Sequence, residues 1–176
     1  MQIPDHRDLM WHKPVDVVCA SDAPEHRTVL DLLPAVLRTQ VHPAGRLDRD
    51  TTGLVLLTSD GQWSHRLTSP NHACGKCYRV ICADPVSDED LQALREGILL
   101  RGEDSPTLPA LAERVNTHTL RLTITEGRYH QVKRMLAARG NKVVGLHREQ
   151  IGDIVLDADL APGEFRALTE EEVAGI

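Results

Sequence analysis

Apolar residues recur along the chain mainly in the short runs and two-residue alternation that are typical of β-strands. In KCYRVIC, for example, Tyr78, Val80 and Cys82 fall on one face of an extended segment. The pattern predicts strands at 17–18, 54–58, 76–82, 110–115, 120–125 and 143–146. Residues 1–14 are polar and predict a loosely held segment, and residues 43–45 predict a turn.

Helical spacing is confined to short segments, and the clearest of these is 131–139. Val132, Met135 and Leu136 share one face there, and Gly140 follows as the residue that ends the helix. Other short helices are expected at 29–37, from Asp60 through Leu67, from the Ser87 cap to Gly97, and from the Thr169 cap onward. Because helices and strands alternate irregularly, with hairpin-like spacing, we expect an α+β fold with a mixed, largely antiparallel sheet.

The composition is that of one soluble domain with an aliphatic core. The chain has 176 residues, of which 41% are hydrophobic and only 3% aromatic. No apolar run approaches the roughly 18–20 residues needed to cross a bilayer, and the first residues lack the apolar core of a signal peptide. The four cysteines do not have the density typical of a disulfide-rich protein, so free thiols in a reduced cytoplasm are expected.

The charge is segregated along the sequence. The whole chain carries −6, but residues 121–148 hold seven basic residues and one acid, Glu126, which gives +6 and leaves −12 elsewhere. Since screening weakens interactions beyond about 8–10 Å, a local basic patch could bind a phosphate backbone in spite of the acidic total.

The stretch HPAGRLDRDTTGLVLLTSDG, residues 42–61, is the strongest candidate site, because a charged loop leads directly into a buried strand. From the residues alone, a surface ion pair in a turn is the more ordinary interpretation. Asp48 and Asp50 could also bind Mg²⁺, although the adjoining arginines make that less attractive. Cys74 and Cys77 form a CxxC pair, but no second pair of zinc ligands has similar spacing.

Four motifs in order resemble those of the pseudouridine synthases. The segment GRLD resembles the family's central motif, whose Asp is the catalytic residue and is here Asp48. KCY resembles the K-x-Y element, in which Tyr78 contacts the target base. EGRYHQVKRM resembles the third motif, in which the basic residue that pairs with the catalytic Asp is here Lys133. Lys13-Pro14 matches the first motif, although Asp16 stands where that motif commonly has Gly.

The resemblance implies the pseudouridine synthase fold, with flanking helices and a central cleft. Residues 1–176 would form a single catalytic domain of two lobes, without the S4 RNA-binding domain common in this branch. DGQWSHRLTSP and LDADLAPGE are most similar to the branch that modifies 16S ribosomal RNA, which implies conversion of uridine 516 to pseudouridine. The implied enzyme is a cytoplasmic monomer that needs no metal or organic cofactor, and its implied RNA-binding residues are Lys13, Arg46, Lys76, Arg128 and Arg134.

The resemblance leaves the chemical role of Asp48 open between nucleophile at C1′ and base at the 2′ position. A non-catalytic RNA-binding module and a metal-dependent nuclease using Asp48 and Asp50 are the alternative functions.

Overall fold

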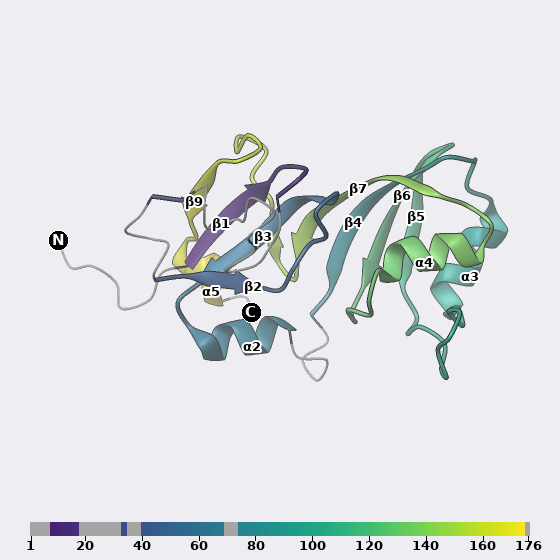
Figure 1. Ribbon diagram of the computed structural model, residues 1–176, viewed down its shortest axis with the longest axis horizontal. Helices are drawn as coiled ribbons and strands as arrows, with labels where there is room; N and C mark the ends of the chain where they lie inside the picture. The colour runs from purple at the N-terminus through teal and green to yellow at the C-terminus, as the bar shows by residue number, and fades with distance from the viewer. Residues whose placement is uncertain (1–7, 18–32, 35–39, 69–73, 175–176) are drawn as a thin grey trace. The chain divides into compact units, whose positions relative to one another are not determined.

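The structure is a computed structural model that describes residues 8–17, 33–34, 40–68 and 74–174 (Figure 1). The chain divides into two compact units. One, the discontinuous unit, consists of residues 1–74 and 150–176, and the other, the continuous unit, consists of residues 75–149. The discontinuous unit is therefore assembled from both ends of the chain.

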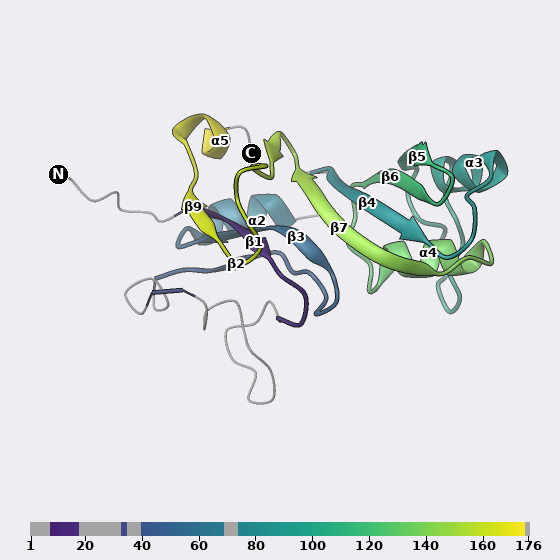
Figure 2. The same cartoon turned by 90° about the horizontal axis from the view of Figure 1, so that it is seen from above.

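The discontinuous unit is a small antiparallel sheet with two helices. β1 pairs with β3 on one side and with β9 on the other, and β2 also pairs with β3. In Figure 2 the yellow C-terminal segment passes through β9 into α5. The elements are β1 (Asp8–Lys13), β2 (His42–Ala44), β3 (Thr52–Thr58), α2 (Gly61–Thr68), β8 (Ile154–Val155), β9 (Phe165–Ala167) and α5 (Glu170–Ala174).

β1 corrects the expectation of a loosely held segment for residues 8–13, whereas residues 1–7 lie outside the described residues. Its Met10 and Trp11 side chains are completely buried, and the strand is hydrogen-bonded along both edges. The strand forms through pairing with β3 and β9. Both partners lie far away in the sequence, so the local pattern does not reveal the strand. The turn expected at 43–45 is likewise partly strand, since β2 runs from His42 through Ala44.

The core cluster of this unit is largely aliphatic and includes Trp63. Asp60 caps α2 as expected, since its Oδ1 accepts hydrogen bonds from the backbone N–H groups of Gln62 and Trp63 at 3.0 and 3.3 Å. The cap directs Trp63 and Leu67 inward. They pack in a cluster with Met10, Ala44, Leu54, Leu56, Ile151 and Ile154.

The continuous unit is an antiparallel sheet with two helices, in the strand order β5-β6-β4-β7. Register places Tyr78 opposite Leu122 and Val80 opposite Leu120, so the buried residues of β4 and β6 share one face. The elements are β4 (Lys76–Cys82), α3 (Asp88–Glu96), β5 (Leu111–Asn116), β6 (Thr119–Ile124), α4 (Gln131–Ala138) and β7 (Val143–Ile151). β7 is longer than the expected 143–146.

A local cap fixes the start of α3, whereas α4 begins after His130 without a side-chain cap. Ser87 and Asp90 form the expected capping box at the start of α3, and Gly97 follows its last residue.

The expected α+β fold with a largely antiparallel sheet is confirmed. Val17 is buried but lies outside any strand, whereas Val18 and most of the expected helix at 29–37 fall outside the described residues. None of the helices within the described ranges is long and apolar enough to span a membrane.

Candidate functional site

Lys13, at the end of β1, holds the loop that contains Asp48. Its side chain is completely buried, and its ammonium donates hydrogen bonds to the backbone oxygens of Pro14, Arg49 and Thr51 at 2.9, 3.0 and 2.7 Å. Charged hydrogen bonds of this kind compensate for removing an ammonium from water. Lys13 was expected to bind RNA, which would require an exposed ammonium. Its buried ammonium instead supports the loop that contains Asp48.

A second contact connects the turn after β1 to the same loop. The backbone N–H of Asp16 donates to the oxygen of Arg49 at 2.8 Å, and the exposed Arg49 side chain lies 3.4 Å from the Asp16 carboxylate. Asp16 has φ = 67°, a left-handed conformation that Gly adopts freely and that Asp tolerates better than most residues. This explains how Asp occupies a position where the motif commonly has Gly.

Asp48 lies between a buried residue and a hydrogen-bonded turn. Leu47 is buried next to it, and the backbone oxygen of Asp48 accepts a hydrogen bond from the N–H of Thr51 at 3.0 Å. The Asp48 side chain is half-buried, whereas Arg46 is exposed. The backbone on both sides of Asp48 is therefore fixed, so its carboxylate projects from a defined position.

The candidate residues of the continuous unit lie on β4 and at the start of α4. Tyr78 is only 9% exposed and sits in the middle of β4, two residues after the half-buried Lys76. Lys133 is half-buried in the first turn of α4. The residues thus fall into two groups, with Lys13, Arg46 and Asp48 in the discontinuous unit and the others in the continuous unit.

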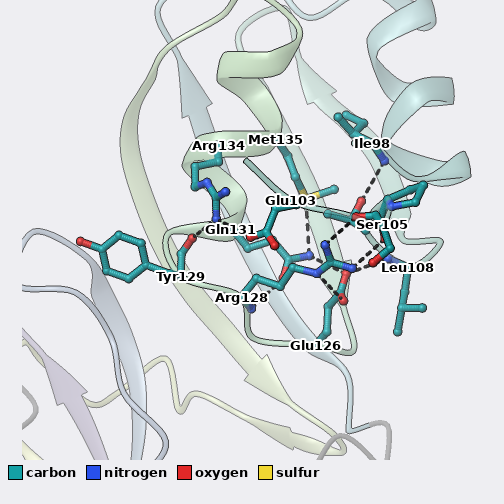
Figure 3. Close-up of polar contacts among 12 residues, drawn as sticks. Ile98, Glu103, Ser105, Leu108, Glu126, Arg128, Tyr129, Gln131, Arg134 and Met135 are labelled. Atoms are coloured by element: carbon teal, nitrogen blue, oxygen red, sulfur yellow. Dashed lines mark hydrogen bonds and ion pairs between the residues drawn. The ribbon is translucent and has the colours of Figure 1, made fainter. Parts of the chain in front are cut away.

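Glu126 is the centre of a hydrogen-bond network in the loop before α4 (Figure 3). Its carboxylate accepts hydrogen bonds from Arg128 Nε at 3.0 Å, from Gln131 Nε2 at 3.0 Å and from the backbone N–H of Leu108 at 2.7 Å. The Arg128 guanidinium also donates to the backbone oxygens of Ser105 and Pro106 at 2.9 and 2.7 Å. Together these contacts attach the segment 105–108 to the third motif.

Arg134 makes a similar attachment one turn into α4. Its guanidinium donates to the Glu103 carboxylate at 3.1 Å, and to the backbone oxygens of Tyr129 and Arg101, both at 3.0 Å. Arg128 and Arg134 were expected to contact RNA phosphates. In the structure both are engaged with the segment 101–106, and their RNA-binding role stays a prediction.

The basic stretch 121–148 is not an open cationic patch. Acids supplied by other segments, or by the stretch itself, pair with most of its arginines, and Arg148 is buried. The ion pairs join Arg121 to Glu113 and Glu149, Arg128 to Glu126, Arg134 to Glu103 and Arg139 to Asp90. Local net charge in the sequence therefore overstated the positive surface of this region, because it did not count partners outside the stretch.

The described cysteines are free thiols. Burial raises the pKa of the Cys77 thiol, and burial followed by the charges of Asp90 and Asp84 raises the pKa of Cys82 to about 11. Both thiols are therefore protonated at neutral pH, which makes them poor nucleophiles. Within the described ranges, no group of three or more His, Cys, Asp or Glu side chains is arranged to hold a metal ion.

Sequence reasoning missed the supporting residues Glu103, Glu126 and Gln131. Glu126 could have been found, because it is the single acid within a strongly basic stretch. Glu103 gives no such indication, since its partner Arg134 lies 31 positions away.

Comparisons with known proteins agree with the motifs. The profile described as RNA pseudouridylate synthase matches residues 8–138. The chain is 56% identical over 170 residues to the ribosomal small subunit pseudouridine synthase A of Escherichia coli (strain K12), which covers 97% of this chain and 74% of that protein. The Vibrio cholerae protein of the same name is 57% identical with the same coverage.

Solved structures share the fold of this chain. A crystal structure of a pseudouridylate synthase matches with a TM-score of 0.95 and 54% identity, covering 98% of this chain and 74% of that one. A chain of the archaeal box H/ACA sRNP Nop10–Cbf5 complex matches with a TM-score of 0.60 at 15% identity, covering 89% of this chain and 51% of that one. At that identity the second match concerns the fold alone.

Proposed function

The chain belongs to the RNA pseudouridylate synthase family, and on this premise we propose that it converts a uridine of small-subunit ribosomal RNA to pseudouridine. The observation that supports the small subunit as target is the 56% identity, over 97% of the chain, to an enzyme named for that subunit. The proposed target is uridine 516 of the 16S RNA.

The reaction exchanges one bond to the sugar for another. The bond between C1′ and N1 of uracil breaks, the base turns, C5 bonds to C1′, the proton of C5 is released and N1 gains a proton. As the first bond breaks, the sugar becomes electron-poor, so a carboxylate beside it stabilises the transition state. We assign this carboxylate to Asp48, acting either as nucleophile at C1′ or as base at the 2′ position.

The remaining residues position the substrate. In the proposal Tyr78 stacks on the uracil while it turns, and Lys133 orients the Asp48 carboxylate. A base stacked within an RNA helix cannot react, so the nucleotide is flipped out, and Arg46 occupies the space that it leaves. Arg46 is exposed next to the loop of Asp48, which supports this role.

We propose that Lys76, two residues before Tyr78, contacts the RNA backbone. Lys13, Arg128 and Arg134 support the loops that carry the site, and we propose that Arg128 and Arg134 also contact RNA phosphates. In this proposal residues 1–176 act as one catalytic domain, as a monomer in the cytoplasm. The isomerisation has no net redox or hydrolytic step, so the proposal includes no metal or organic cofactor.

The test is the Asp48→Asn variant, which removes the charge and keeps the shape of the side chain. With 16S RNA tritiated at C5 of uridine, release of tritium should fall by about a hundredfold to a thousandfold or more, because a preorganised charge at the reacting centre is lost. Binding of the RNA should stay within about twofold.

The matched control is Asp50→Asn, which changes the exposed carboxylate two residues along and should retain tritium release. An active Asp48→Asn enzyme refutes the assignment of Asp48. A wild-type chain that binds RNA without releasing tritium indicates a non-catalytic RNA-binding module, and RNA cleavage that is abolished by EDTA indicates a nuclease.

A further inference from the structure

Tyr129 is the most exposed aromatic residue of the chain. It is 77% exposed, whereas Trp11, Trp63 and Tyr78 are at most 9% exposed and Phe165 is half-buried. Exposing a large ring in this way gains nothing for folding. The Tyr129 ring is therefore available for a contact outside the chain.

The ring of Tyr129 is held flat against a second ring. It stacks on the imidazole of His130, with 4.0 Å between the ring centroids and 16° between their planes. A stacked pair restricts the tyrosine side chain, so less rotational freedom is lost when a further planar group binds. The pair therefore forms a preorganised planar surface.

The backbone beneath the pair is fixed on both sides. The oxygen of Tyr129 accepts a hydrogen bond from Arg134 Nη1, and the side chain of Gln131 accepts one from the backbone N–H of Arg128. His130 has φ = 47°, a left-handed conformation that is uncommon for a residue other than Gly. Strain of this kind is typical of functional sites, and here it orients the two consecutive rings where α4 begins.

Figure 3 shows the Tyr129 ring pointing away from the network around Glu126, while the backbone oxygen of Tyr129 is hydrogen-bonded to Arg134. The networks of Glu126 and Arg134 thus support the ring without covering it. Lys133, the motif residue proposed to orient Asp48, lies four positions later on α4.

We propose that Tyr129, supported by His130, is a stacking platform for an unpaired nucleobase of the substrate RNA other than the target uridine. This inference rests on the proposed function, which makes RNA the ligand. Exposed aromatic rings bind unpaired bases by stacking, and this mode accepts any base. A base on Tyr129 remains open to water, which suits a contact that positions the RNA and is unsuited to the reacting uracil.

The experiment compares four variants in binding and in turnover on 16S RNA tritiated at C5 of uridine. Tyr129→Ala removes the ring, Tyr129→Leu keeps an apolar side chain without a planar ring, and Tyr129→Phe keeps the ring. Leu111→Ala is the matched control, since it trims another exposed apolar residue of the same unit, 73% exposed.

Tyr129→Ala and Tyr129→Leu should raise the dissociation constant of the RNA by about 5- to 100-fold, the range expected for one base–aromatic stack. KM should rise in the same way, with kcat at saturating RNA within about twofold. Tyr129→Phe and Leu111→Ala should bind as the wild type does. Since Tyr129 is exposed, thermal unfolding of all four variants should match that of the wild type.

Wild-type binding by Tyr129→Ala overturns the inference and leaves the proposed function intact. Equal weakening by Tyr129→Phe and Tyr129→Ala also overturns it, because an aromatic plane would then be insufficient. If the wild type releases no tritium, the proposed function fails, and the binding series still decides the stacking inference because it requires no turnover.

Discussion

The ammonium of Lys13 lies 3.0 Å from the backbone oxygen of Arg49, the residue that directly follows Asp48. A residue at the end of the first strand thus determines the path of the candidate catalytic loop. The geometry gives the first motif a positioning role, because the buried Lys13 side chain contacts the backbone of the loop at two positions, Arg49 and Thr51.

Replacing Lys13 with Met should destabilise the protein and impair the reaction together. The substitution keeps the length of the side chain but leaves three backbone oxygens, of which the Thr51 oxygen is in a buried hydrogen bond, without this donor, so we expect the free energy of unfolding to fall by about 2–4 kcal/mol. Urea unfolding measures the first effect, and tritium release below the unfolding transition measures the second.

The control for Lys13 is Lys76→Met, which removes a half-buried ammonium in the other unit. It should change the unfolding free energy by less than about 1 kcal/mol. Full stability of the Lys13 variant would contradict the supporting role.

Glu126→Ala should loosen the segment that the third motif holds. The variant removes the acceptor of three hydrogen bonds, one of them from the N–H of Leu108, and leaves Arg128 without its carboxylate partner. We expect a loss of about 2–3 kcal/mol in unfolding free energy and faster hydrogen exchange at the Leu108 amide. Urea unfolding and exchange followed by NMR are the measurements.

Glu113→Ala is the matched control, because Glu113 forms an ion pair with Arg121 while its side chain is 67% exposed. Exposed ion pairs contribute little, so its effect should stay below about 1 kcal/mol. If both variants behave alike, the Glu126 network has no special stabilising role.

Stability should fall in acid partly through Glu172. Hydrogen bonds from Arg166 are the main cause that lowers the pKa of the Glu172 carboxyl below its ordinary value of 4.5. The stabilisation is therefore complete above pH 4.5 and is lost as the pH falls through the lower pKa of the folded state. The difference in unfolding free energy between the wild type and Glu172→Gln should shrink between about pH 5 and pH 3.

Glu171→Gln is the comparison for this pH effect, because it changes the exposed neighbour of Glu172 on the same helix. Its difference from the wild type should vary less over the same range. A Glu172→Gln difference that is constant with pH would contradict the assigned linkage.

Structure that depends on neighbouring residues was accessible from the sequence. The caps at Asp60, at Ser87 with Asp90 and at Thr169 with Glu172 all form as expected, because donor and acceptor lie two or three positions apart. The strand 76–82 was accessible for a similar reason, since its alternation is visible in seven residues.

Features that depend on distant partners were not accessible. The segment DLMWHK carries polar residues at both ends, and only its pairing with β3 and β9 explains why Trp11 is buried. The burial of Lys13 was hidden for the same reason, since two of its acceptors lie 36 and 38 positions away. Motif resemblance pointed to Asp48, Tyr78 and Lys133 as site residues, but it gave no information on the residues that support them.

The split of one unit between the two ends of the chain has a consequence for biosynthesis. During translation, residues 75–149 emerge as an unbroken stretch and can collapse early. In contrast, Trp11 in β1 cannot pair with Phe165 in β9 until Phe165 has been synthesised. At about 5–20 residues per second, this delay is on the order of ten seconds, during which the outer edge of a nascent strand stays unprotected. Chaperone capture of the growing polypeptide is therefore most useful at its N-terminal half.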